Sequence, residues 1–262
     1  MNKRQPLSVT IITYNEEQHI RAALESVAWA DEIVVVDSQS TDRTVEICRA
    51  YTEYVYQIPW HGYVEQKNIA TEKASHLWIL NIDADERVSP ELAKEIQDAL
   101  SQEARYVGFS MPRKTYYLGG WIAHCGWYPD EKLRLYRKDC GLWVGQSLHE
   151  QVQINGPTAK LSSDLYHYTY QNIADHLQKM NSFTSLAAAQ KQESVTGAGI
   201  FLRTVLTFFK KYLLQQGFRD GTRGVIVCLL AAFTVTLKYS KLWERQQVPL
   251  QKKPSFLKKP GF

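Results

Sequence analysis

The sequence predicts an α/β protein with a mainly parallel sheet covered by helices on both faces, followed by a helical extension. Apolar, β-branched runs alternate with helical patterns up to about residue 103. Shorter, more polar strands are expected after that point, and the pattern is helical from about residue 173. We therefore divide the chain into 1–103 and 104–171, two halves of one domain, and a basic helical extension over 172–262. A chain of 262 residues can bury a full core.

The first part shows regular strand and helix patterns. Strands are expected at 7–13, 32–37, 54–57 and 77–82, and helices at 15–29, 41–51, 63–73 and from Ser89 onward. Ser40 or Thr41 can cap the second helix, and Ser89-Pro90-Glu91 combines a cap, a first-turn proline and an acid. In the second part, strands are expected at 106–113, 132–137, 143–144, 150–154 and 165–170.

Charge is spread unevenly along the chain. The formal net charge is +4, yet twelve Lys or Arg and only two acids lie from residue 200 onward. This tail should meet an anionic surface. The apolar run 224–237 is shorter than the roughly 20 residues that a spanning helix needs. Basic and apolar helices of this kind suit the membrane interface, although they could instead cap the first domain or form an oligomer contact.

The cysteines and the N-terminus favour a cytoplasmic protein. Cys48, Cys125, Cys140 and Cys228 show neither CxxC pairing nor zinc spacing. The first residues lead directly into a strand and do not resemble a secretion signal. Both features fit a reducing cytoplasm.

The expected strand at 77–82 ends in Asp83-Ala84-Asp85. In open α/β sheets, ligands bind outside the carboxyl ends of the strands. Two carboxylates at such an end can hold a divalent cation against a phosphate. The alternative is an acidic turn that caps the next helix.

The loops after the first two strands lack the Gly-x-Gly-x-x-Gly of dinucleotide sites. This argues against a dehydrogenase or a Rossmann methyltransferase. Asp37 instead ends the second strand, where its carboxylate can accept hydrogen bonds from a base or a ribose. Helix capping by Asn15, Ser40 and Thr41 is compatible with this role.

Three segments, in the same order, resemble the nucleotide-binding half of family 2 glycosyltransferases: 9–17, 33–44 and 81–86. Segments of the second half resemble the subgroup that adds glucose to the inner core of bacterial lipopolysaccharide, and these are 126–130, 133–138, 148–150, 165–168 and 217–224. The resemblance implies a GT-A fold, a nucleoside-diphosphate sugar donor, Mg²⁺ or Mn²⁺, and inversion at the anomeric carbon. Residues 1–103 would then be the nucleotide-sugar-binding half.

The resemblance also implies roles for individual residues. Asp37 would hold the uracil or ribose, with Thr13, Tyr14 and Glu16 in the same pocket. Asp83 would reach the ribose and the metal, and Asp85 would bind the metal directly. Lys67 lies where the family often carries an arginine near the nucleotide, and His167 matches a histidine that many GT-A enzymes place on the metal. His167 could equally be structural.

Glu150 is our candidate general base, because its place downstream of Asp85 matches that of the family's base. A surface glutamate at a strand start is the alternative. The neighbouring His149 could position the acceptor or Glu150, or could merely pack. Arg134 and Arg137 lie on one expected strand, where we expect them to share a face and to contact the diphosphate. Two solvent-facing arginines are the alternative there.

The loop that carries Trp121, His124, Trp127 and Tyr128 is rich in aromatic residues. Aromatic faces suit sugar rings, so we expect this loop to bind the acceptor, with a hydrophobic plug under a long loop as the alternative.

Together these features predict an inverting, metal-dependent glycosyltransferase at the cytoplasmic face of the membrane. UDP-glucose is the favoured donor, a lipid-linked core saccharide is the favoured acceptor, and no nucleic acid is expected. The oligomeric state is not predicted. A polyprenyl-phosphate glycosyltransferase, a nucleotidyltransferase and a non-catalytic saccharide-binding membrane protein are the rival hypotheses. The nucleotidyltransferase is disfavoured because no Gly-rich loop with a lysine lies near the first strand.

Overall fold

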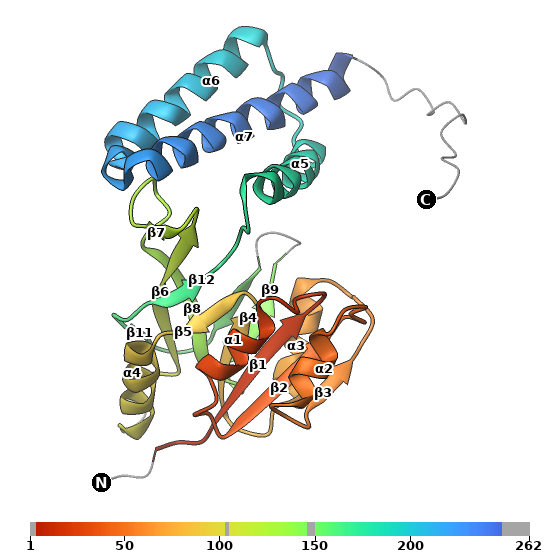
Figure 1. Ribbon diagram of the computed structural model, residues 1–262, viewed down its shortest axis with the longest axis vertical. Coiled ribbons are helices and arrows are strands. Elements are labelled where there is room, and N and C mark those ends of the chain that lie inside the picture. Colours follow the sequence, from red (N-terminus) through yellow and green to blue (C-terminus); the bar gives the residue numbers. More distant parts are fainter. Residues whose placement is uncertain (1–3, 103–104, 146–149, 248–262) are drawn as a thin grey trace, which may run out of the picture. The chain divides into compact units, whose positions relative to one another are not determined.

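The structure of the protein is a computed structural model that describes residues 4–102, 105–145 and 150–247. The chain divides into two compact units (Figure 1). Unit 1 comprises Met1–Tyr116 and Trp127–Thr169, and unit 2 comprises Tyr117–Gly126 and Tyr170–Phe262. The sequence-based division kept residues 117–126 within 104–171, whereas the structure groups this segment with the C-terminal helices.

Unit 1 is built around a mixed sheet with strand order β3-β2-β1-β4-β8-β6-β12-β5. Strands β3, β2, β1 and β4 run parallel to one another, whereas β8 is antiparallel to both β4 and β6. The strands are β1 (Leu7–Thr13), β2 (Glu32–Asp37), β3 (Val55–Gln57), β4 (Trp78–Asp83), β5 (Glu86–Val88), β6 (Gly108–Tyr117), β8 (Asp130–Arg137), β9 (Gly141–Val144), β10 (Gln151–Ile154), β11 (Thr158–Lys160) and β12 (Leu165–His167). The helices are α1 (Ile20–Ser26), α2 (Thr44–Arg49), α3 (Tyr63–Lys73) and α4 (Pro90–Ser101).

Helices cover both faces of the parallel part of this sheet. Val9 and Ile11 of β1 belong to a core cluster that also contains buried residues of α1, α2 and α4. Ile12 faces the other way and packs with Ala70 of α3. Every residue of β1 is buried, which is why this strand reads as a continuous apolar run. The predicted α/β class is confirmed.

Two helices begin later than their patterns predict. Helix α1 begins at Ile20 rather than near Asn15, and α2 begins at Thr44 rather than near Thr41. Asn15 has a φ of 54°, its amide donates to Ser40 Oγ at 2.8 Å, and its side chain accepts from the Thr41 amide at 2.8 Å. Ser40 and Thr41 therefore tie two loops together instead of capping α2. The Ser89 cap on α4 is confirmed by a 3.1 Å bond from the Leu92 amide.

Unit 2 consists of helices and one short strand, and α6 and α7 lie side by side (Figure 1). Its elements are β7 (Gly120–Ile122), α5 (Ile173–Gln190), α6 (Gly197–Phe209), the π-helix η1 (Lys210–Leu214), the 3₁₀-helix η2 (Gly217–Asp220) and α7 (Gly221–Gln247). Ala188, Val195, Tyr239 and Leu242 form a buried cluster that joins α5 and α7.

The segment 217–224 has a structural role within unit 2. A Cβ on Gly224 would lie 1.8 Å from the Gly217 carbonyl oxygen, so only glycine permits this close approach. The Asp220 carboxylate accepts from the His124 amide at 2.8 Å and lies 2.7 Å from His124 Nδ1. These contacts fix the segment 117–126 to the start of α7.

One helical stretch among the described residues, Gly217–Gln247, is long and apolar enough to cross a membrane by length and composition alone. The expectation that the run 224–237 is too short to span is wrong by this criterion. The helix continues beyond Lys238 and adds Tyr239, Leu242 and Trp243 to the apolar content.

The buried His176 predicts a pH dependence for the stability of unit 2. Its ring stacks on Tyr170 with centroids 3.9 Å apart, and its Nδ1 lies 3.0 Å from the Tyr117 hydroxyl. Burial lowers the pKa of His176 from 6.5 to about 4. The unfolded chain therefore binds a proton below pH 6.5 that the folded protein refuses until about pH 4, so acidification through this interval favours unfolding.

We expect unit 2 to lose about 2–3 kcal/mol of stability across this interval through His176. Urea unfolding at a series of pH values measures the loss. His176→Gln should flatten the slope, and equal slopes in the two proteins would contradict the prediction.

Candidate active site

The carboxyl ends of β1, β2 and β4 lie at one edge of the sheet. In the strand register, Thr13 stands opposite Asp37, and Ile12 stands opposite Asp83. Parallel strands bring the residues that end them to the same edge. The candidate site is built at this edge, as the sequence predicts.

A cluster of hydrogen-bonded polar side chains lies where β1 and β2 end. Asp37 is fully buried, and its carboxylate accepts hydrogen bonds from the amide and the hydroxyl of Ser40. Gln66 Nε2 donates to Ser38 Oγ at 2.9 Å, and the Ser38 amide donates to the Thr13 carbonyl at 2.8 Å. Thr13 Oγ1 and Gln66 Oε1 are buried and find no partner among the described residues. Such orphaned atoms are rare in folded proteins, and here they mark a place where a ligand's polar groups could bind.

Tyr14 and Glu16 lie on the loop that follows β1. Tyr14 is 56% exposed, and Glu16 is partly buried. The Glu16 amide donates to Thr44 Oγ1 at 2.8 Å, which fastens this loop to α2. Of the four residues expected to surround the nucleoside, Thr13 and Asp37 end β1 and β2, and Tyr14 and Glu16 lie on the loop after β1.

Asp83 is held between two cations. Its Oδ1 lies 2.9 Å from Lys67 Nζ, and its Oδ2 lies 2.6 Å from an Arg134 nitrogen. Burial alone would raise the pKa of Asp83, but the charges of Arg134 and Lys67 hold it well below its ordinary value. Asp83 is therefore ionised at neutral pH, and each of its oxygens has a fixed direction.

Behind Asp83 lies a buried ionic network that sequence reasoning did not assign. Glu86 is fully buried and accepts from the Asp83 amide at 2.9 Å. Its other oxygen accepts from Arg134 at 2.8 Å and from Arg113 at 3.0 Å. Arg113 also binds Asp130 at 2.7 Å. In the sequence, only the position of Glu86 directly after Asp83-Ala84-Asp85 pointed to a role at this site.

Glu150 is brought to Asp83 by Lys67. The Lys67 ammonium is 1% exposed, lies 3.6 Å from Glu150 Oε1, and sits 4.4 Å from the ring centroid of Trp143. Asn68 fixes Trp143 through two 3.0 Å hydrogen bonds to its backbone. The candidate base therefore lies on the same side of the sheet edge as the aspartates.

Tyr63, which is 42% exposed, lies in the electrostatic field of the same carboxylates. Burial raises the pKa of the Tyr63 phenol, and so do the negative charges of Glu150, Asp83, Asp85 and Glu16. Tyr63 begins α3, the helix that also carries Lys67.

Asp85 lies beside His167, and their role as metal ligands stays a prediction. Their Oδ2 and Nε2 atoms lie 3.4 Å apart, and the Asp85 carbonyl accepts from the Tyr168 amide at 2.9 Å. Burial would raise the pKa of Asp85, but the hydrogen bond and charge of His167 lower it below its ordinary value. β12 pairs with β5, which places His167 opposite Glu86.

The side chains at this site can hold a divalent cation only if a bound ligand supplies further oxygen atoms. Among the described residues, no group of three or more His, Cys, Asp or Glu side chains could hold a metal ion. Asp85 and His167 offer one oxygen and one nitrogen, a combination that Mn²⁺ accepts. Diphosphate oxygens and water would have to complete the shell. Because both oxygens of Asp83 already face cations, its role as a direct metal ligand stays a prediction.

Arg134 and Arg137 do not share a face, and that expectation is wrong. Arg134 is buried against Asp83 and Glu86, whereas Arg137 binds Asp139 at 2.6 Å at the far end of β8. Residues three apart on a strand point to opposite faces. Arg134 therefore orients Asp83 from within the protein, and Arg137 lies away from the site.

The residues expected to bind the acceptor are divided between the units. Trp121 and His124 belong to unit 2, where His124 is bound to Asp220. Trp127 and Tyr128 belong to unit 1, and the Tyr128 hydroxyl donates to Asp164 at 2.9 Å. His149 lies outside the described residues.

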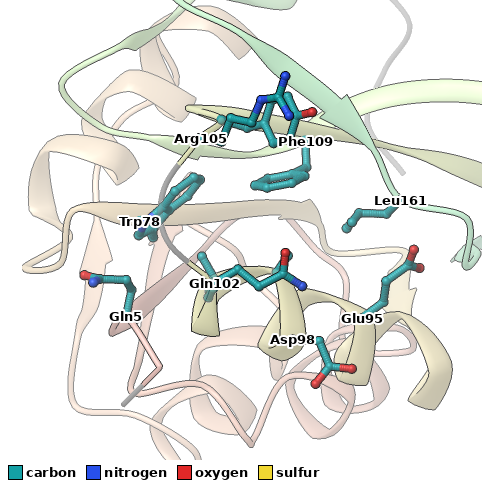
Figure 2. A pocket seen from close by; sticks show the side chains of 11 residues that line it. Gln5, Trp78, Glu95, Asp98, Gln102, Arg105, Phe109 and Leu161 are labelled. Carbon is teal, nitrogen blue, oxygen red and sulfur yellow. The ribbon is translucent and has the colours of Figure 1, made fainter. Parts of the chain in front are cut away.

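A separate cavity of about 510 Å³ lies in unit 1 (Figure 2). Gln5, which precedes β1, and Trp78, the first residue of β4, line it together with Phe109. Glu95 and Asp98 of α4 are also among its lining residues. Because Asp83 is the last residue of β4, this cavity lies at the opposite ends of the strands and is not the candidate active site.

The ionic network predicts unequal effects for two arginines on the same strand. Arg134→Met removes the charge that neutralises Asp83 and buried Glu86, and should destabilise unit 1 by about 3–5 kcal/mol. Arg137→Met removes an exposed pair and should cost less than about 1 kcal/mol. Urea unfolding followed by tryptophan fluorescence measures both losses. Similar losses would contradict the proposed difference.

The chain is similar to known glycosyltransferases along most of its length. The family model named glycosyl transferase family 2 matches residues 8–155. The lipopolysaccharide core biosynthesis glycosyltransferase LpsC of Rhizobium meliloti is 30% identical over 262 residues, and 94% of each protein is covered. An uncharacterized glycosyltransferase of Rickettsia typhi is 30% identical over 253 residues, covering 91% of this chain and 87% of that protein.

Among solved structures, glucosyl-3-phosphoglycerate synthase from Mycobacterium tuberculosis in complex with Mn²⁺, UDP and glucosyl-3-phosphoglycerate has a TM-score of 0.48 at 17% identity. That match covers 70% of this chain and 78% of the other. Staphylococcus aureus TarS 1–349 has a TM-score of 0.46 at 17% identity, covering 92% and 91%. These scores are too low to carry an argument. Because the family model spans more than half of the chain and LpsC aligns with nearly all of it, the protein belongs to glycosyl transferase family 2.

Proposed function

We propose that the protein is an inverting, metal-dependent glycosyltransferase that moves a hexose from a UDP-sugar onto a lipid-linked saccharide. Glucose from UDP-glucose is the favoured donor, and a lipopolysaccharide core is the favoured acceptor. The enzyme would work at the cytoplasmic face of the membrane. The observation that carries this proposal is the link from Asp83 through Lys67 to Glu150, because it joins a donor-side carboxylate to a candidate base.

The proposed reaction needs a base and a stabilised leaving group. The Glu150 carboxylate takes the proton of an acceptor hydroxyl while the hydroxyl oxygen bonds to the anomeric carbon. The bond from that carbon to the diphosphate breaks on the opposite face of the sugar, so UDP leaves and the configuration inverts. A divalent cation on Asp85 and His167 would neutralise charge on the diphosphate. Thr13, Tyr14, Glu16 and Asp37 would surround the nucleoside.

The choice of acceptor draws on the relative LpsC, whose name refers to lipopolysaccharide core biosynthesis. The basic, apolar tail supports a lipid-linked acceptor near an anionic surface. Trp121, His124, Trp127, Tyr128 and His149 remain the proposed acceptor residues. Because the stretch Gly217–Gln247 meets the length criterion for spanning, a polyprenyl-phosphate acceptor is the second candidate. Transfer to a polyprenyl phosphate but not to a core saccharide would select it.

A nucleotide-sugar screen tests the donor and the metal. We expect UDP-glucose with Mn²⁺ or Mg²⁺ to raise the melting temperature by several degrees, since a ligand that binds the folded state stabilises it by mass action. EDTA should remove most of that shift. Asp85→Asn should lose the metal-dependent part, whereas Asp139→Asn, which lies beside Arg137, should keep it. If no UDP-sugar shifts the melting temperature with either metal, the donor class is wrong.

Removing the candidate base separates catalysis from binding. Glu150→Gln should lower kcat by about 10²- to 10⁴-fold, because an amide cannot take the acceptor proton. The affinity for UDP-sugar should stay within about threefold, as judged by titration calorimetry. Glu53→Gln, an exposed residue just before β3 at the opposite ends of the strands, is the matched control and should leave both values unchanged. Full turnover by Glu150→Gln would exclude Glu150 as the base and favour a non-catalytic or differently catalysed function.

A further inference from the structure

Helix α6 of unit 2 carries several large apolar side chains that are exposed in the structure. None of the 13 residues of α6 is buried. The helix nevertheless carries seven large apolar residues, which are Ile200, Phe201, Leu202, Val205, Leu206, Phe208 and Phe209. A helix in a water-soluble fold normally buries its apolar stripe against a core.

The inner side of α6 already has a partner in α7. Thr204 Oγ1 lies 2.8 Å from Thr236 Oγ1, and the Arg203 guanidinium sits 4.4 Å from the ring centroid of Tyr239. Ile200 packs against the cluster that contains Tyr239. By helical spacing, Leu202, Leu206 and Phe209 lie on the opposite side of α6 from Ile200 and Thr204.

Those outward side chains form one stripe that continues into η1. Leu202, Leu206, Phe209 and Leu213 follow each other at intervals of four, three and four residues, and they are 57%, 57%, 50% and 52% exposed. This spacing places them on one helix face. Phe201 at 72% and Leu214 at 79% flank the stripe. We call these six residues the α6 outer face.

The end of the α6 outer face combines aromatic rings with positive charge. The rings of Phe208 and Tyr212 stack at 5.4 Å, and Phe218 lies 6.1 Å from Tyr212. Lys210 and Arg219 are exposed beside them. No Asp or Glu occurs between Glu193 and Asp220. Aromatic rings and lysines or arginines at the rim of an apolar surface are typical of the boundary between lipid head groups and acyl chains.

We infer that the α6 outer face lies flat in the interface of an anionic phospholipid bilayer, without crossing it. The stretch Gly197–Leu214 has 18 residues, and Arg203 and Lys210 interrupt its apolar run. Charges at those positions are costly in the hydrocarbon core but favourable among phosphate head groups. This inference extends the membrane part of the proposed function and does not depend on the identity of the sugar.

The longer helix α7 is less suited to enter the membrane because it forms the core of unit 2. Six of its residues are buried. Lys241 Nζ donates to the Asn181 carbonyl and to Thr184 Oγ1 of α5, at 2.7 and 2.8 Å. Arg245 donates to the Ala188 carbonyl at 2.8 Å. Insertion of α7 alone would break these bonds, whereas insertion of the α6 outer face breaks none.

Vesicle binding by the full-length protein tests this inference. The vesicles contain phosphatidylethanolamine and phosphatidylglycerol, and pure phosphatidylcholine vesicles serve as the neutral comparison. We expect Leu206→Glu with Leu214→Glu to lower the partition coefficient roughly tenfold or more, since two apolar side chains would no longer leave water. Leu77→Glu with Leu142→Glu is the matched control, because both leucines are exposed in unit 1, and it should change binding less than twofold.

Charge and depth are tested separately. Lys210→Glu with Arg219→Glu should weaken binding to the anionic vesicles, as should high salt, and should have little effect on neutral vesicles. Alkaline carbonate should release the bound wild-type protein. Retention after carbonate would show that α7 spans the bilayer and would overturn the inference. Equal binding by the Leu206/Leu214 variant and the wild type would overturn it as well.

Two further measurements keep these outcomes distinct from a folding defect or a wrong function. The melting temperature of the Leu206/Leu214 variant should match that of the wild type, and a large decrease would show that this face packs within the protein. If the glutamate variant does not fold, Leu206→Ser with Leu214→Ser replaces it. The variant should bind UDP-glucose with Mn²⁺ as the wild type does. Failure of both proteins to bind donor would refute the proposed function and leave the vesicle result standing.

Discussion

The candidate site depends on the pairing of partly buried Asp83 with two cations from different parts of the chain. Lys67 comes from α3, and Arg134 comes from β8. A carboxylate withdrawn from water at the end of β4 is stable only when its charge is matched by such partners. Because both oxygens are held, the direction of Asp83 is set before any ligand arrives. Glu86 extends the same pairing to Arg113, so four strands (β4, β5, β6 and β8) and helix α3 are joined through carboxylates.

The second constraint is a set of hydrogen bonds between the loops that follow β1 and β2. Asn15, with its left-handed backbone, exchanges hydrogen bonds with Ser40 and Thr41, and Asp42 accepts from the Glu17 amide at 3.2 Å. These bonds replace the helix starts that the pattern alone predicts. As a result, the loops after β1 and β2 form one wall, and Thr13 and Asp37 stay buried behind it.

The sequence was most informative where one residue both ended a strand and carried charge. Asp37, Asp83 and Asp85 each follow an apolar run, so their common edge could be predicted from local pattern and topology. Glu86 and Arg113 could not, because their pairing joins strands that become neighbours only in the folded sheet. The expectation that Arg137 shares a face with Arg134 was wrong because side chains three residues apart on a strand point to opposite faces. The grouping of residues 117–126 with the helices rests on Asp220 and Arg223, about a hundred residues away, which bind His124 and Leu118.

Lys67 illustrates how the chemistry of one side chain decides the arrangement. The family often carries an arginine here, yet a planar guanidinium directs its hydrogen bonds along a rigid fork. An ammonium is a compact charge that can be approached from several directions. Lys67 uses this freedom to meet Asp83, Glu150 and the face of Trp143 at once. A buried ammonium requires such partners, because its charge is otherwise costly to remove from water. Lys67 therefore contacts both Asp83 and Glu150, although these two carboxylates lie 67 positions apart in the sequence.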